Sequence, residues 1–395
     1  MLAALHLAEH NRYLCRVATR LFVHIKEQDR ALHLLKSEPT IKSDPWLLAA
    51  EIAVSSLSNK NSKFIDVALR IIGSKQYMGQ QISELAAAVG TVELMHGAAK
   101  RAKSLFQTSL IEPTDNSLAQ AQWAVCHDAK IVIPDSAWRV PASFEAKTLA
   151  SRHEHDWNNA LQTCARWLAD EPFSLRPAIL GSYLGFRPEH TGMAEKFASA
   201  GLRCDSANPM LLNNRAVARA YQGKIDEAYS DIGLALQDGT SRNDAHLVAT
   251  LGLIAFRSGC PDLGRELYAQ SVGWFHHEKN QASAASAMLH WLREEIRLDR
   301  SIAPKAIDFS QRVLKMSASS KQPELHGMGV LLIEEAKTEL DVGKIHYASR
   351  ELECPSHMDL AHSATLFHVP DTAKQFAARL MVEVDDKENM NSKTL

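Results

Sequence analysis

Apolar residues recur along most of the chain at the spacings i, i+3, i+4 and i+7, which is the period of an amphipathic helix. Alternating patterns that would favour strands are scarce. The β-branched run at 131–133, before Pro134, is the clearest strand-like stretch. The hydrophobic pattern therefore predicts an all-α protein with one strand-like or irregular interruption.

Small and apolar residues also repeat over a longer distance. The residues that recur at a spacing of 34 are Ala160, Ala194 and Ala228, and likewise Leu168, Leu202 and Leu236. A fixed period of this length is typical of helical repeat arrays. Each unit of such an array is a pair of helices too short to bury its own apolar face, so neighbouring pairs must stack to form a core.

The clearest unit begins at Pro209 and continues as LLNNRAVARAYQGKIDEAYSDIGLAL. Its small packing residues, turn glycine and second-helix seam are Asn214, Ala216, Gly223, Ala228, Ala235 and Leu236. Units from Ser83, near Pro141 and near Ala245 share parts of this pattern, including turn glycines at Gly97 and Gly259. In these residues the chain resembles the tetratricopeptide repeat (TPR) family. The resemblance implies a TPR-like α-solenoid, a right-handed superhelix of antiparallel helix pairs.

Two arginines depart from the family pattern. Arg215 and Arg219 stand where the family usually has apolar residues. A buried guanidinium needs a carboxylate partner, and Asp226, Glu227 and Asp231 on the following helix are the candidates. An ion network within the repeat is the simpler interpretation. The alternative is that this unit faces a partner.

The pattern divides the chain into six segments, with one superhelix disturbed around 129–141. The segments are degenerate helical repeats at 1–82, a TPR-like repeat and a following helix at 83–128, an irregular insert at 129–140, the clearest TPR-like array at 141–278, degenerate repeats at 279–383 and a polar, mobile tail at 384–395. Within the first segment, the stretches at 29–39 and 64–75 are expected to be second helices of pairs.

Composition limits the compartment and the class of partner. The 395 residues include 44 Lys and Arg against 46 Asp and Glu, so the net charge is -2 and general basicity gives no support for nucleic acid. The chain has no apolar run of about 18 residues, no secretory signal and no CxxC pair among its six cysteines. We therefore expect a cytoplasmic protein with no membrane span.

Motifs for catalysis are absent from the sequence. There is no GxxxxGK[ST] loop, GxSxG elbow, HExxH helix or GxGxxG turn. We expect no enzymatic activity, no catalytic residues and no cofactor. The basic spot Lys100-Arg101-Lys103 is read as the solvated face of an amphipathic helix, so nucleic acid is not expected as a direct ligand.

Eighteen histidines raise the question of a metal site. The clusters are His153 with His155, His276 with His277, and Cys354 with His357, His362 and His368. A metal site needs a closed set of ligands, and ordinary surface histidines explain each cluster more simply, so no metal is expected. A metal-dependent enzyme built on the last cluster stays open as a third hypothesis.

If the family geometry transfers, the first helix of each pair lines a concave groove. The groove residues expected to contact a partner are Arg152, His153, Arg176, Tyr183, Phe186, Arg187, Asn213, Asn214, Tyr221 and Arg257. Arginines pair with carboxylates, amides bond to a peptide backbone and aromatic rings supply apolar anchors. Each of these residues could instead be structural. Asn213 and Asn214 are the strongest candidates, because asparagine in mid-helix is a poor helix former.

The sequence thus favours a non-catalytic scaffold or adaptor that holds a protein or peptide within a larger assembly. The alternative is a sensor or regulatory subunit of an enzyme complex, with its catalytic part on another chain or on a missing segment. Self-association stays open. The partner itself is not encoded in any motif.

Overall fold

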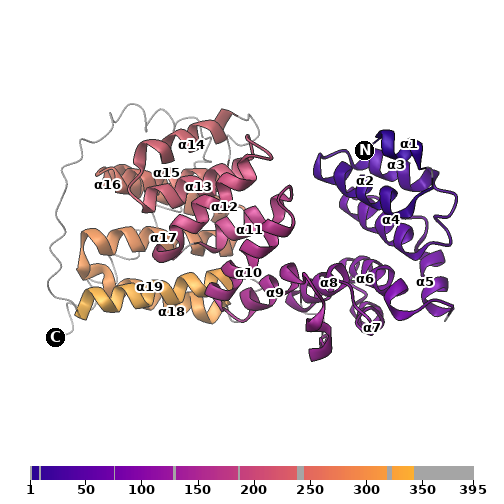
Figure 1. Cartoon of the computed structure of the whole chain (residues 1–395). Helices are drawn as coiled ribbons and strands as arrows, with labels where there is room; N and C mark the ends of the chain where they lie inside the picture. Colours follow the sequence, from indigo (N-terminus) through magenta and orange to yellow (C-terminus); the bar gives the residue numbers. More distant parts are fainter. Residues whose placement is uncertain are drawn as a thin grey trace. The chain divides into compact units, whose positions relative to one another are not determined.

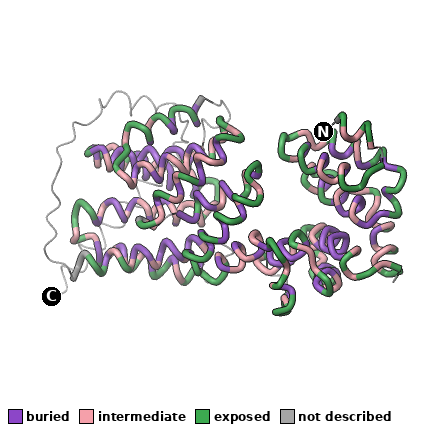
Figure 2. Tube along the Cα trace, in the orientation of Figure 1, coloured by how far each residue is buried: buried purple, intermediate pink, exposed green. Residues whose placement is uncertain are grey.

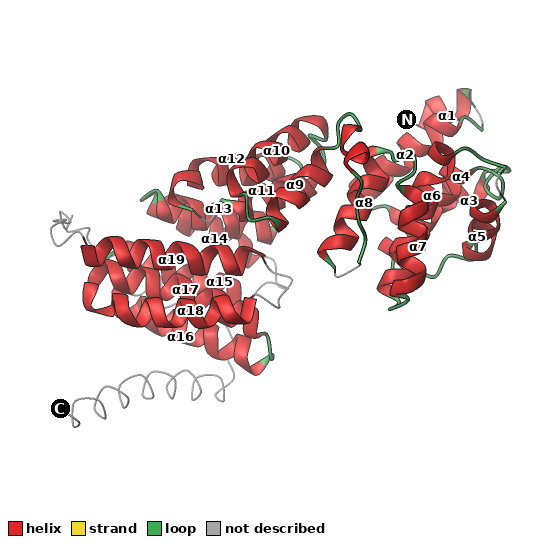
Figure 3. Ribbon diagram, turned by 90° about the horizontal axis from the view of Figure 1, so that it is seen from below, coloured by secondary structure: helices red, strands yellow, loops and turns green. Residues whose placement is uncertain are grey.

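The computed structural model describes residues 2–8, 10–74, 76–127, 130–185, 187–237, 244–317 and 323–341. In these ranges the protein is all-α: nineteen α-helices and three short 3₁₀-helices, with no strand (Figures 1 and 3). The predicted helical class is confirmed. The tail at 384–395 and, within the C-terminal segment at 279–383, residues 318–322 and 342–383 lie outside the described residues.

The chain folds into two compact units, which divide between Ser174 and Leu175. The division falls within the array expected at 141–278. The helices of unit 1 are α1 (Leu2–Leu7), α2 (Arg12–His24), α3 (Gln28–Ser37), α4 (Pro45–Leu57), α5 (Ile65–Gly73), α6 (Gly79–Met95), α7 (Ala99–Ser109), α8 (Asp115–Cys126), η1 (Asp135–Arg139), α9 (Phe144–His153) and α10 (Trp157–Asp170). The helices of unit 2 are α11 (Leu175–Leu184), η2 (Pro188–His190), α12 (Thr191–Leu202), α13 (Pro209–Tyr221), α14 (Ile225–Gln237), α15 (Ala245–Arg257), α16 (Pro261–His277), α17 (Gln281–Leu298), η3 (Arg300–Ile302), α18 (Ala303–Ser317) and α19 (Pro323–Asp341).

Local sequence signals set the ends of these helices. The Asn208 side chain accepts a hydrogen bond from the Leu211 amide at 3.2 Å, and Pro209 occupies the first turn of α13. Short turns then connect the helices of a pair. Gly97, Gly223 and Gly259 have positive φ angles of 81°, 77° and 85°. These three are the turn glycines expected from the sequence, because glycine adopts this conformation without strain.

In both units, each first helix packs on the next first helix, and the second helix of the pair packs against both. In unit 2 the first helices α11, α13, α15, α17 and α19 each pack on the next first helix. Each second helix, α12, α14, α16 or α18, packs between its own first helix and the following one. In unit 1 the pairs α2–α3, α4–α5 and α6–α7 repeat this arrangement, with α3 and α5 at the places expected for second helices. Buried residues therefore run along the contacts between consecutive helices (Figure 2).

Small residues of the 34-residue period lie in these contacts. Ala160, Ala194 and Ala228 are at most 2% exposed. In the next repeat, which is two residues longer, the corresponding residue is Gly264, 36 positions after Ala228. An added Cβ there would lie 2.4 Å from the Phe256 ring. That separation is below any real contact, so only glycine fits beside this phenylalanine. Glycine in place of alanine at this position thus has a steric cause.

The irregular insert replaces one second helix. After α8 the described residues 130–143 contain the 3₁₀-helix η1 and no α-helix. Residues 130–134 are not a strand, so of the two interpretations, strand-like or irregular, the irregular one holds. Instead Ile131 and Ala137 are buried in one cluster with Ala124 of α8 and Ala146 of α9. The two helices also pack directly on each other. The insert is therefore part of the core of unit 1.

We predict that Ala228→Glu destabilises the protein by about 2–4 kcal/mol, because it places an unpaired carboxylate at a fully buried seam of α14. Urea unfolding followed by circular dichroism measures the loss. Ser230→Glu is the matched control, since Ser230 is exposed on the same helix, and it should change stability by less than about 0.5 kcal/mol. Equal midpoints for both variants would show that the seam is assigned to the wrong residues.

Candidate partner-binding site

The first helices of unit 2 bring most of the expected groove residues together. We call the side formed by α11, α13, α15, α17 and α19 the first-helix face. Asn214 Nδ2 donates to Ser182 Oγ of α11 at 2.9 Å, and Thr250 Oγ1 of α15 donates to Asn213 Oδ1 at 2.7 Å. The two amides thus join α13 to both neighbouring first helices. These bonds compensate for asparagine in mid-helix and give both residues a structural role.

Tyr221 is held between two guanidinium groups at the end of α13. The Cζ atoms of Arg257 and Arg293 lie 5.0 Å and 4.6 Å from its ring centroid. Its hydroxyl lies 2.7 Å from His290 Nδ1 of α17. Stacking on two cations and a hydrogen bond together fix the ring. One residue of α13 therefore contacts both α15 and α17.

Two ion pairs continue this cluster toward the end of unit 2. Arg257 Nε lies 2.6 Å from Glu294 Oε2, and Glu294 is only 2% exposed. Arg293 donates through Nε and Nη2 to the two oxygens of Glu335 at 2.8 Å and 2.6 Å. Such fork-like pairs are geometrically specific. They connect α15 to α17, and α17 to α19.

Burial sets the protonation of this cluster. It lowers the pKa of His290 to about 3, and the nearby Arg293 charge acts in the same direction. The imidazole is therefore neutral near pH 7. Burial also raises the pKa of Tyr221 above its usual value. Burial raises the pKa of Glu294, while Arg257 opposes that rise.

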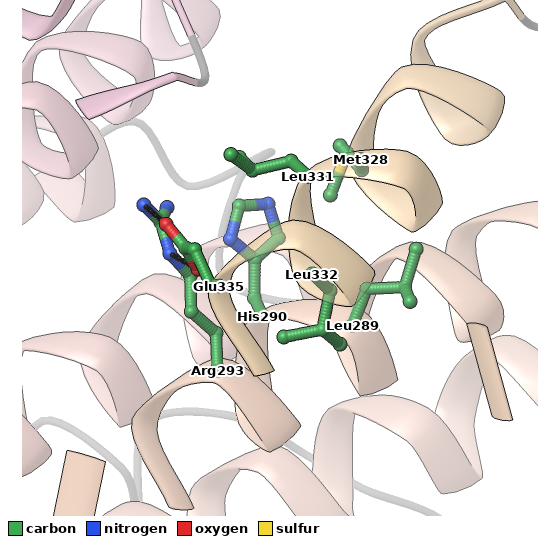
Figure 4. A pocket seen from close by; sticks show the side chains of 7 residues that line it. All are labelled: Leu289, His290, Arg293, Met328, Leu331, Leu332 and Glu335. Carbon is green, nitrogen blue, oxygen red and sulfur yellow. Dashed lines mark hydrogen bonds and ion pairs between the residues drawn. The ribbon is translucent and has the colours of Figure 1, made fainter. Parts of the chain in front are cut away.

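A small hollow lies beside the cluster between α17 and α19 (Figure 4). The side chains that line it are Leu289, His290, Arg293, Met328, Leu331, Leu332 and Glu335. In Figure 4 the Arg293 and Glu335 side chains point toward each other next to His290. The hollow has a cavity volume of about 10 Å³, which is room for about one water molecule. It is far smaller than a typical small-molecule pocket.

Other expected groove residues are more accessible. Tyr183 on α11 is 46% exposed, and Arg176 at the start of the same helix is exposed. Arg187 follows α11 and contacts Glu189 Oε1 at 2.7 Å and Glu334 Oε2 at 3.2 Å. Phe186 lies outside the described residues. The open part of the first-helix face is therefore at α11.

Two of the expected residues belong to unit 1. Arg152 and His153 lie in the last turn of α9, where His153 is exposed and Arg152 is half-buried. At the spacing of 34 residues, His153 shares a register with Arg187 and Tyr221, whereas Arg152 does not. The expected groove residues are thus distributed over two compact units.

Arg215 and Arg219 form ion pairs within their own helix pair, and Arg219 also reaches the preceding second helix, α12. Arg215 donates to both oxygens of the buried Asp231 at 2.9 Å and 2.6 Å. Arg219 reaches Asp231 at 2.8 Å and Glu195 at 3.0 Å. Glu227 contributes only its main-chain carbonyl, at 3.4 Å from Arg219 Nη1. The ion network predicted from the sequence is confirmed, with Asp231 as its shared carboxylate.

The described part of the chain holds no group of three or more His, Cys, Asp or Glu side chains arranged to bind a metal ion. His155 instead stacks on Trp157, with ring centroids 5.6 Å apart. The set at 354–368 lies outside the described residues.

In the basic spot, Arg101 pairs with Glu93 at 3.0 Å. Among the described helices, none is both long and apolar enough to span a bilayer.

Comparison with known proteins adds no assignment. No protein-family model matches the chain, and no curated protein matches it in sequence. The resemblance to TPR units therefore stays a prediction. Function has to be inferred from the residues themselves and from the order in which the helices pack.

We predict that acidification removes stability through His290. Its pKa is about 3 in the folded protein against 6.5 for an ordinary histidine, so the unfolded chain binds the extra proton more readily between these values. Stability is thus complete above pH 6.5 and is lost as the pH falls toward 3. Between pH 7 and pH 5 this one group should cost about 2 kcal/mol in urea unfolding.

His290→Gln should remove that share of the pH dependence, whereas His153→Gln, at an exposed site, should keep it. The quantity to compare is the change in unfolding free energy between the two pH values. A His290→Gln protein with the same change as the parent would contradict an imidazole that stays neutral in the folded protein.

Proposed function

We propose that this chain is a TPR-like α-solenoid, a right-handed superhelix of antiparallel helix pairs, that binds a protein or peptide partner without catalysing a reaction. The order of helix contacts carries the proposal. First helices pack on first helices from α11 to α19, and second helices pack between them. This order supports a continuous row of first-helix side chains for an extended partner.

The proposed contact surface is the open part of the first-helix face. On α11, Tyr183 is 46% exposed and Arg176 is exposed. Such side chains suit apolar and acidic groups of a peptide. Asn213, Asn214, Tyr221 and Arg257 already bond to neighbouring helices. We assign those four a supporting role, in which they hold the first helices at fixed spacing.

In this proposal the protein acts as a scaffold or adaptor in the cytoplasm. Stoichiometric capture of a partner by the tagged full chain from its native host, identified by mass spectrometry, is the primary test. Light scattering of the purified chain shows whether a second copy competes for the same surface. An enzyme as the captured partner would favour the regulatory-subunit alternative.

We predict that Tyr183→Ala weakens binding of the captured partner about 5- to 30-fold, which corresponds to about 1–2 kcal/mol. Stability should change by less than about 1 kcal/mol, because the ring is 46% exposed. Leu234→Ala is the matched control, since Leu234 is 48% exposed on the second helix α14. Titration of the purified partner by calorimetry measures both affinities.

The control should bind like the parent. If Leu234→Ala weakens binding and Tyr183→Ala does not, the partner contacts second helices and the proposed surface is wrong. A purified chain that captures no partner at stoichiometric yield would count against the scaffold function itself.

A further inference from the structure

A row of apolar side chains lies at the surface of unit 1 along α2. Tyr13 is 73% exposed and Leu21 is 40% exposed, with the half-buried Val17 between them. The three residues are spaced by four, so they lie on one side of the helix. We call them the α2 stripe. Single exposed apolar residues are ordinary, whereas a contiguous apolar row is typical of an interaction site.

Left-handed turn residues give a common register for the first helices of unit 1. Lys26, Asn59 and Gly97 have φ angles of 63°, 52° and 81°, and each stands two residues after the end of α2, α4 or α6. Positions can therefore be counted back from these turns. The residues that correspond to the α2 stripe are Trp46, Ala50 and Val54 in α4, and Glu84, Ala88 and Val92 in α6.

In α4 and α6 these positions face the preceding helix pair. Val54 is buried in one cluster with Ala18 and Phe22 of α2. Ala88 is buried in one cluster with Leu48 of α4. None of the six corresponding residues is exposed. The α2 stripe therefore lies on the side where the inner first helices receive a preceding pair.

The described helix that precedes α2 covers little of this side. It is α1 (Leu2–Leu7), which has six residues and packs on α2. Its Leu5 contacts the core cluster, but Leu7 is 85% exposed. The outermost repeat of a soluble array usually has a polar outer face. The α2 stripe is apolar instead, so this side is suited to receive another helix.

The two arginines beside the stripe are already paired. Arg16 Nη2 lies 2.7 Å from Glu84 Oε2, and Arg20 Nη2 lies 3.0 Å from Glu171 Oε1. Because each pair is neutral, two such faces can meet without opposing like charges. The complementary surface is thus another apolar helix with a neutral border. A second copy of this chain has such a helix.

From these observations we propose that the α2 stripe is a dimerisation surface that takes the α2 stripe of a second copy. Tyr13 and Leu21 are each four residues from Val17, so an antiparallel pairing about Val17 places Tyr13 of each copy on Leu21 of the other. Such an isologous contact uses the same residues twice and closes at two copies. It gives α2 the neighbouring helix that α4 and α6 already have.

This inference goes beyond the proposed function and does not depend on it. The α2 stripe belongs to unit 1, whereas the proposed partner surface is on α11 of unit 2. One helix packed on its copy buries less area than a standard interface. We therefore expect a weak dimer with a dissociation constant on the order of 10 µM.

Sedimentation velocity of the full chain between about 1 and 300 µM tests the proposal. The parent should pass from the mass of one chain toward that of two. Leu21→Glu and Tyr13→Ser should each raise the dissociation constant at least about tenfold, because the change is made in both copies. Ile111→Glu is the control, since Ile111 follows α7 and is 71% exposed, and it should dimerise like the parent.

Crosslinking tests the pairing itself. Val17→Cys places a thiol at the centre of the proposed contact. A short bis-maleimide should join residue 17 of one copy to residue 17 of the other, which peptide mass spectrometry identifies. The parent, which has an exposed Cys204, is treated in the same way. Crosslinks only at other cysteines would contradict a pairing about Val17.

Several results would overturn the proposal. A monomer at every concentration would show that no second copy covers the stripe, and a series of larger oligomers would exclude an isologous contact. A dimer that both stripe variants leave intact, or that Ile111→Glu weakens equally, would place the interface elsewhere. Circular dichroism melting shows that each variant is folded, and Tyr13→Ser, at the more exposed position, decides the test if Leu21→Glu unfolds the protein.

Discussion

Close approach of consecutive helices is the constraint on which both units depend. A helix pair of this length cannot bury its apolar face alone, so the backbones must come near enough for neighbouring faces to merge. The small seam residues permit this. An added Cβ at Gly181 would lie 2.5 Å from the Phe197 ring, and one at Gly201 would lie 2.5 Å from Leu211. Each glycine thus pairs with a large side chain that fills the space it leaves.

Polar side chains then determine the position of each first helix relative to its neighbours. Asn213, Asn214 and Tyr221 connect α13 to three other first helices through side-chain contacts. The pair Arg257–Glu294 adds a buried charge contact. Buried ion pairs contribute modestly to net stability, but a misplaced partner is costly. The network therefore favours one spacing of the first helices over alternatives that would bury apolar area equally well.

The sequence predicts the repeated part of this design and misses the part that depends on distant contacts. The alanine period, the turn glycines and the Arg215–Asp231 pair are local or lie within one repeat, so spacing along the chain reveals them. His290, Arg293 and Glu335 lie in a stretch without a clean repeat motif. Their partners are 42 to 69 residues away, and only the fold brings them together.

The irregular segment after α8 affects how strongly the neighbouring repeats of unit 1 are coupled during unfolding. In a linear array, each repeat is coupled to the rest only through its nearest neighbours. At this joint a segment that includes η1 and is anchored by Ile131 and Ala137 takes the place of a second α-helix, so fewer residues of regular helix pack between α8 and α9. Cooperativity should therefore break here first, and native-state hydrogen exchange would show α9 and α10 opening at a lower free energy than α4 to α7. A uniform opening energy across unit 1 would instead mean that the buried loop couples its neighbours as firmly as a helix does.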